Sequence, residues 1–144
     1  MAIAIRGVRV WDGFADAVPS ETQTIRIETG RIAAIGPAAE LSAGADVVAF
    51  DAAPTESAAA TAIPTVIPGL IDAHVHLTLD PAIADPKRQL AVSPDALETA
   101  MRARAQAMLR AGITTARDLG GGGWHELSLR DRIGSGETPG PRLL

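Results

Sequence analysis

The stretch "VIPGLIDAHVHL", residues 66–77, decides the fold of this chain. It is apolar apart from Asp72, His74 and His76, which recur at every second position. Because successive side chains of a β-strand point to opposite faces, this spacing predicts the three polar groups on one face and the intervening apolar side chains on the other. Two imidazoles and a carboxylate on a buried strand cost free energy unless each finds a partner.

A divalent metal ion is one such partner for the histidines. Neutral imidazole nitrogens at positions i and i+2 can converge on one ion, typically Zn²⁺, at about 2.0–2.1 Å. The chain has no cysteine, so a metal site in it must be built from histidine and carboxylate ligands. The alternative is that both histidines are hydrogen-bonded core residues that bind no ligand.

Downstream of Pro68, predicted strands alternate with predicted helices, which is typical of βαβ units and a parallel sheet. The elements are strands in 71–77, 112–120 and at the end of 136–144, and helices at 94–111 and 124–133. The first helix is the best defined, because Ser93 can cap it and Gly112 can end it. The glycines at 120–123 predict a flexible loop between strand and helix.

The N-terminal part predicts a separate small β-domain at 1–67. Its strands are expected at 2–10, in a hairpin around Thr29 and Gly30, and at 46–51, and short strands with tight turns favour an antiparallel β-sandwich. Residues 52–64 predict a surface loop. The second domain is then 68–144.

The stretch 66–77 resembles the first barrel strand of the amidohydrolase superfamily, in which a Pro-Gly-Leu-Ile-Asp-x-His-x-His run follows a small N-terminal β-domain. "AGITTARDLGG", residues 111–121, and "GETPGPRLL", residues 136–144, are similar to the branch that contains imidazolonepropionase-like and Xaa-Pro-dipeptidase-like enzymes. The resemblance implies an α/β fold: the first two to three strands of a TIM (β/α)₈ barrel, preceded by the β-sandwich domain.

The resemblance also implies the chemistry. His74 and His76 match metal ligands for one or two divalent ions, expected to be Zn²⁺, and Asp72 matches an acidic position that orients them, unless it only pairs locally. Such enzymes cleave amide or dipeptide-like C–N bonds with metal-activated water. Arg117 and Asp118 are weaker candidates for substrate contact, with a structural ion pair equally open.

The remaining parts of the family's site have no counterpart in the sequence: a lysine or glutamate that bridges metals, two further histidines and a final aspartate. His125 is expected to be a solvent-exposed histidine outside the site. A complete barrel needs about 250 residues. We therefore expect an N-terminal part, inactive alone and completed within the same or a separate chain. The alternative is a stand-alone, non-catalytic protein that keeps the ancestral strand.

Charge and hydropathy limit the classes of molecule that this chain is expected to bind. The net charge is −4 and the 13 lysines and arginines are scattered, which argues against nucleic acid. No window approaches ~18 consecutive apolar residues, so we expect no membrane span and a cytoplasmic location. The expected partner is a small-molecule substrate, and homo-oligomerisation stays open.

Overall fold

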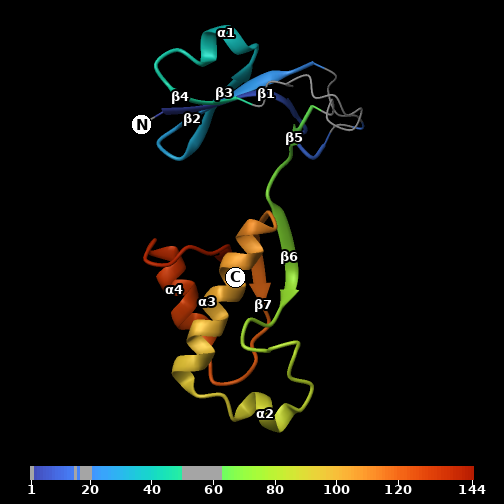
Figure 1. Cartoon of the computed structure of the whole chain (residues 1–144), viewed down its shortest axis with the longest axis vertical. Helices are drawn as coiled ribbons and strands as arrows, with labels where there is room; N and C mark the ends of the chain where they lie inside the picture. Colours follow the sequence, from blue (N-terminus) through green and yellow to red (C-terminus); the bar gives the residue numbers. More distant parts are fainter. Residues whose placement is uncertain (1, 15, 17–20, 50–62) are drawn as a thin grey trace, which may run out of the picture. The chain divides into compact units, whose positions relative to one another are not determined.

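A computed structural model describes residues 2–14, 16, 21–49 and 63–144 of the chain (Figure 1). The chain divides into two compact units, a first unit of Met1–Pro68 and a second unit of Gly69–Leu144. Each unit has its own β-sheet. The two units are considered in turn.

The first unit is built on one five-stranded mixed sheet. Its elements are β1 (Ala2–Val10), β2 (Gln23–Glu28), β3 (Arg31–Gly36), α1 (Ala38–Leu41), β4 (Asp46–Ala49) and β5 (Thr65–Val66). The strand order is β3-β2-β1-β4, and β5 also pairs with β1. Thr29 and Gly30 both have positive φ, 49° and 75°, and make the tight β2–β3 turn that the sequence predicts.

The prediction that this unit is antiparallel is wrong for its described part, and the β-sandwich itself stays a prediction. β1, β2 and β3 are antiparallel neighbours, whereas β4 and β5 pair with β1 in parallel, within a single sheet. The physical reason is α1, a short crossover that the sequence analysis did not predict and that returns the chain in the direction of β1. Residues 52–62 of the predicted loop, and 50–51 of the predicted strand, lie outside the described residues.

The second unit is a three-stranded parallel sheet with helices. Its elements are β6 (Leu70–Val75), α2 (Pro86–Leu90), α3 (Pro94–Arg110), β7 (Ile113–Asp118), α4 (His125–Gly134) and β8 (Arg142–Leu143). The strand order β6-β7-β8 follows the sequence, and both pairings are parallel. The prediction of strands that alternate with helices in a parallel sheet is therefore confirmed. Only α2, a single short helix, was not predicted.

Helix α3 forms where its sequence signals place it. The Ser93 hydroxyl oxygen accepts a hydrogen bond from the main-chain N–H of Ala96 at 3.4 Å, and Pro94 occupies the first helical position. Gly112, with a φ of +85°, follows the helix end. The helix ends at Arg110, one residue before the predicted end.

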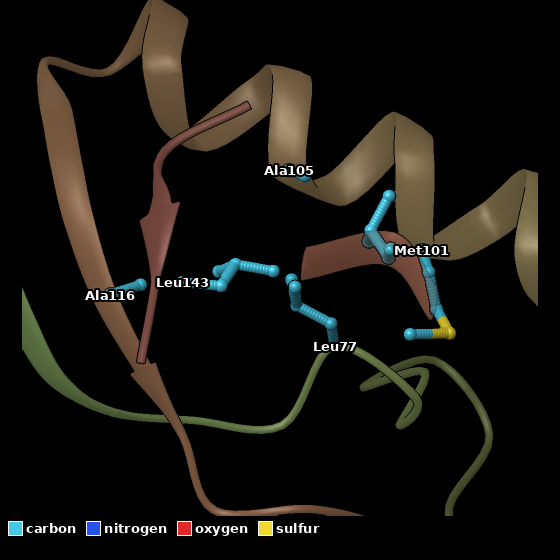
Figure 2. Packing of buried hydrophobic residues seen from close by; sticks show 6 residues of the cluster. Leu77, Met101, Ala105, Ala116 and Leu143 are labelled. Atoms are coloured by element: carbon cyan, nitrogen blue, oxygen red, sulfur yellow. The ribbon is translucent and has the colours of Figure 1, made fainter. Parts of the chain in front are cut away.

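Helices α3 and α4 contact β7 and β8, respectively, as well as each other. Their apolar stripes and the sheet form one buried cluster, which consists of Leu77, Met101, Ala105, Ala116, Leu129 and Leu143. Figure 2 shows Leu77, Leu143 and Met101 directed toward one another beneath α3. This packing fixes the position of the chain directly after β6, because Leu77 belongs to the cluster.

Arg132 on α4 joins the two helices through polar contacts. Its guanidinium donates hydrogen bonds to Glu98 of α3 and, at 2.9 Å, to Glu137. The hydrogen bond to Glu98 is the main reason that the pKa of Arg132 is raised above its usual value. None of the described helices is long and apolar enough to cross a membrane.

Candidate metal centre

His74 and His76 lie at the carboxyl end of β6. His74 belongs to the strand, and His76 follows its last residue, Val75. Because Val75 and Leu77 pack in the core of the second unit, alternation directs both imidazoles to the opposite face of the sheet. His74 is exposed and His76 is half-buried. Catalytic groups of parallel α/β barrels gather at this end of the strands.

The two imidazoles converge. Nε2 of His74 lies 3.1 Å from Nε2 of His76, and the ring planes are 74° apart. Two nitrogens bound to one ion at 2.0–2.1 Å are separated by about 2.9 Å at a right angle and about 3.3 Å at a tetrahedral angle. The observed separation falls between these values, so the pair fits one divalent ion. In the absence of an ion, one Nε2 can donate a hydrogen bond to the other.

A second contact determines which nitrogen of His76 is available. Nδ1 of His76 is hydrogen-bonded to the main-chain carbonyl oxygen of Gly120, in the loop between β7 and α4. A carbonyl oxygen only accepts hydrogen bonds, so Nδ1 must carry the proton. The neutral ring then has its lone pair on Nε2, which faces His74. Metal-binding histidines commonly show this arrangement, in which the second nitrogen donates to a carbonyl or carboxylate.

Asp72 departs from the alternation expected for β6. The pairing of β6 with β7 is irregular between Asp72 and Val75, and Asp72 is paired with Ala116, which is buried in the core. The alternation expected along β6 is thus interrupted between Asp72 and Val75. The carboxylate accepts a hydrogen bond from the main-chain N–H of His74 at 3.1 Å. This contact is local, and orientation of the ligands by Asp72 stays a prediction.

Asp118, at the end of β7, is engaged with the main chain of two loops. Its Oδ2 accepts the N–H of Leu77 at 3.1 Å, and its Oδ1 accepts the N–H of Gly120 at 2.8 Å. The neighbouring Arg117 is exposed and donates from Nε to the main-chain carbonyl of Ala73 at 3.0 Å. Both side chains thus tie β6 to β7, and their contact with a substrate stays a prediction.

His125 is exposed at the first residue of α4, as expected. Within the part of the chain that the structure describes, no group of three or more histidine, aspartate or glutamate side chains is arranged to hold a metal ion. The donor set on β6 therefore comprises two imidazoles, and a complete site requires at least one further ligand.

The sequence of the second unit matches a family model. The model is that of the amidohydrolase family, and the match covers residues 65–144, more than half of the chain. The chain belongs to the amidohydrolase family. Enzymes of this family generally use divalent metals, in agreement with the donor set on β6. The resemblance predicted from residues 66–77 is thereby confirmed.

Solved structures of other amidohydrolases are similar to this chain. A Xaa-Pro dipeptidase with bound methionine superposes with a TM-score of 0.76 at 27% identity and covers 100% of this chain. Molinate hydrolase gives 0.77 at 28% identity, and phenylurea hydrolase B gives 0.75 at 28%, each over 99% of this chain. The chain spans 32%, 29% and 30%, respectively, of the length of these three proteins. No curated protein matches the sequence.

Sequence reasoning did not identify Gly120 as a partner of His76. The glycines at 120–123 were interpreted as a flexible loop in preference to a close backbone approach to a ligand, and Gly120 lies 44 residues after His76 in the sequence. The backbone shows why glycine is needed at this place. Gly120 has a φ of +78°, and a Cβ on Gly121 would overlap the side chain of Thr78. Glycine lets this loop approach the end of β6 closely.

Proposed function

We propose that these residues form the first part of the barrel of a metal-dependent amidohydrolase that cleaves a C–N bond of an amide or peptide-like substrate. His74 and His76 supply two ligands of its metal site. The observation that carries the proposal is the convergence of their Nε2 atoms to 3.1 Å, with the proton of His76 held on Nδ1 by Gly120.

The residues of this chain prepare the site in three ways. The core packing of Leu77 anchors the end of β6. The carbonyl of Gly120 orients the ring of His76 and keeps its Nε2 free to bind an ion. The open position of His74 leaves room for substrate and water beside the site. A divalent ion bound there supplies Lewis-acid chemistry and activates water for attack on a carbonyl.

The complete activity requires more polypeptide than these elements. A (β/α)₈ barrel has eight parallel strands, whereas the second unit has three. Ile71 on β6 is 74% exposed and Leu70 is 48% exposed. Apolar side chains of a (β/α)₈ barrel strand are normally covered by the outer helices or by the side-chain layers of the barrel interior. We propose that the rest of the barrel, from the same or a separate chain, covers them and supplies the remaining ligands, and that residues 1–144 alone are inactive.

The first unit also has exposed apolar side chains that further polypeptide would cover. Four apolar side chains of its sheet are between 46% and 63% exposed: Ile32, Ile35, Val47 and Val48. They lie on β3 and β4, at the two ends of the strand order, and exposed apolar side chains on such strands are ones that a further segment would cover. The expected substrate is named only by its bond, because the solved relatives act on a dipeptide, molinate and phenylurea, according to their names.

Metal analysis with histidine variants tests the proposal. In the completed enzyme, His74→Ala and His76→Ala should each deplete bound Zn²⁺ and abolish hydrolysis of amide and dipeptide substrates. His125→Ala is the matched control, since His125 is exposed and lies on α4, and it should retain both metal and activity. Full metal content in the His74 and His76 variants would refute the ligand assignment.

The second candidate is a stand-alone, non-catalytic protein. The observation in its favour is that the described residues hold no cluster of three metal ligands. Metal analysis separates the two candidates. Stoichiometric Zn²⁺ in the wild-type protein, with or without the polypeptide that completes the barrel, supports the hydrolase. Its absence in both preparations supports the non-catalytic protein.

A further inference from the structure

We propose that Asp118 is a positioning residue for the metal ligand His76 and that it acts through the main chain of Gly120. The inference rests on the proposed function, because it assumes that His76 binds the ion. It assigns to Asp118 a role other than contact with substrate. The side chain of Asp118 has no described hydrogen bond to His76 itself. Two hydrogen bonds connect them through Gly120, and a third joins Asp118 to Leu77, the residue after His76.

The carboxylate of Asp118 holds the loop after β7 through two hydrogen bonds. Asp118 is the last residue of β7, and its main-chain N–H donates to the carbonyl of Leu144 at 3.1 Å, so its backbone is fixed by the residue that follows β8. From this position, one carboxylate oxygen accepts the N–H of Gly120 at 2.8 Å, and the other accepts the N–H of Leu77 at 3.1 Å. The carboxylate therefore joins the loop after β7 to the chain after β6.

The hydrogen bond between Gly120 and His76 passes this restraint to the ligand. Holding the N–H of Gly120 fixes the start of a loop in which Gly120 has a φ of +78°. The Gly120 carbonyl is the acceptor for Nδ1 of His76. Since the partner of one imidazole nitrogen determines which nitrogen is protonated, the fixed carbonyl keeps the lone pair on Nε2. Asp118 thereby sets both the orientation and the tautomer of His76.

The other end of the connection is also held in place. Leu77, whose N–H Asp118 accepts, follows His76 directly and is 3% exposed in the core. The carbonyl of Leu77 accepts a hydrogen bond from Arg104 of α3 at 2.7 Å. The carboxylate thus binds both the segment that carries His76 and the segment that carries Gly120. It thereby fixes the distance between these two segments.

A carboxylate is the side chain that this geometry requires. Both partners of Asp118 are N–H donors, so both of its terminal atoms must accept. Asparagine has the same shape, but it offers one acceptor and one donor. Asp118→Asn can keep one of the two hydrogen bonds and places an NH₂ group against the other N–H. Asp118→Asn is therefore the most specific variant for the test.

The matched control is Asp80→Asn. Asp80 also lies in the chain after β6, and its carboxylate accepts a main-chain N–H, that of Ala82, at 2.9 Å. Its carboxylate also forms an ion pair with Arg104 at 3.1 Å. The guanidinium of Arg104 is the group that donates a hydrogen bond to the Leu77 carbonyl. Asp80 has no described hydrogen bond to Gly120 or His76. Both variants replace a carboxylate that accepts a main-chain N–H, and only Asp118 is hydrogen-bonded to Gly120, whose carbonyl binds His76.

The experiment measures Zn²⁺ affinity by chelator competition and, without metal, the ring ¹⁵N shifts of His76, which report its tautomer. In the completed wild-type enzyme we expect Zn²⁺ binding and a proton on Nδ1 of His76. In Asp118→Asn we expect about 10- to 100-fold weaker Zn²⁺ binding, the range typical of lost outer contacts of metal ligands, and a mixture of tautomers. Asp80→Asn should leave both readouts unchanged.

The outcomes separate the two proposals. A completed wild-type enzyme that binds no Zn²⁺ overturns the proposed function. A wild type that binds Zn²⁺, together with an Asp118→Asn variant equal to it in affinity and tautomer, overturns only the role of Asp118. Should Asp118→Asn fail to fold, Gly120→Ala displaces the same carbonyl by strain at positive φ and must give the same two effects. Equal losses in Asp80→Asn, or failure of both test variants to fold, would mean that Asp118 only stabilises the fold.

Discussion

Replacement of Leu77 by alanine should destabilise the second unit strongly. Leu77 is 3% exposed and belongs to the buried cluster beneath α3 and α4 (Figure 2). The change removes three buried carbon atoms, each worth about 0.8 kcal/mol of transfer free energy. The sum is about 2.4 kcal/mol, and the cavity left in a close-packed core adds to it. We expect a loss of about 3–4 kcal/mol in the free energy of unfolding, within the range for buried leucines.

Hydrogen exchange monitored by mass spectrometry is the suitable assay, because it reports on the amides of α3 and β7 separately from those of the first unit. Leu90→Ala is the matched control: the same side chain is removed from α2 in the same unit, but Leu90 is 82% exposed. It should change the free energy of opening by less than about 0.5 kcal/mol. A loss below about 1 kcal/mol for Leu77→Ala, or equal losses in the two variants, would refute the proposed packing around β6.

Two further variants test the contacts that hold the loops at the site. Gly121→Ala should cost about 1–3 kcal/mol, because its Cβ would overlap the buried side chain of Thr78, and an unchanged melting temperature would show that this close approach is absent. Arg104→Met keeps the aliphatic stem but loses the hydrogen bond to the Leu77 carbonyl, so about 1–2 kcal/mol of stability should be lost in urea denaturation. An equal loss in Arg102→Met, on the same helix, would contradict this contact.

The elements of the second unit could be predicted because their signals are local. Ser93 and Pro94 begin α3 and Gly112 follows its end, so the predicted and observed bounds differ by one residue. β-branched residues and a glycine run likewise predicted β7 and the loop after it. Helix α2, Pro86–Leu90, spans little more than one turn and is too short to show an apolar period.

The pairing of strands could not be predicted in the same way. Whether β4 lies parallel or antiparallel to β1 depends on the crossover through α1, and the residues of a short strand do not specify its direction. The irregularity between Asp72 and Val75 is also a property of the pair of strands. Strict alternation along β6 predicts Asp72 on the face of the imidazoles, and the shift in register interrupts that alternation.

The proximity of the two candidate ligands could be predicted from the sequence, whereas the contacts that hold His76 in place could not. The spacing of His74 and His76 on one strand is enough to bring two imidazoles together. Their support comes from Gly120 and Asp118, more than 40 residues later in the chain, as the hydrogen bonds across 44 and 41 residues show. Only the folded parallel pair of strands reveals that the two loops meet.

X-ray absorption spectroscopy of the Zn²⁺-loaded, completed enzyme tests the central claim most directly. The account predicts at least two imidazole nitrogens at about 2.0–2.1 Å from the metal, and one imidazole fewer in each of the His74→Ala and His76→Ala variants. A zinc environment that contains no imidazole, or that is the same in the wild type and both variants, would contradict it.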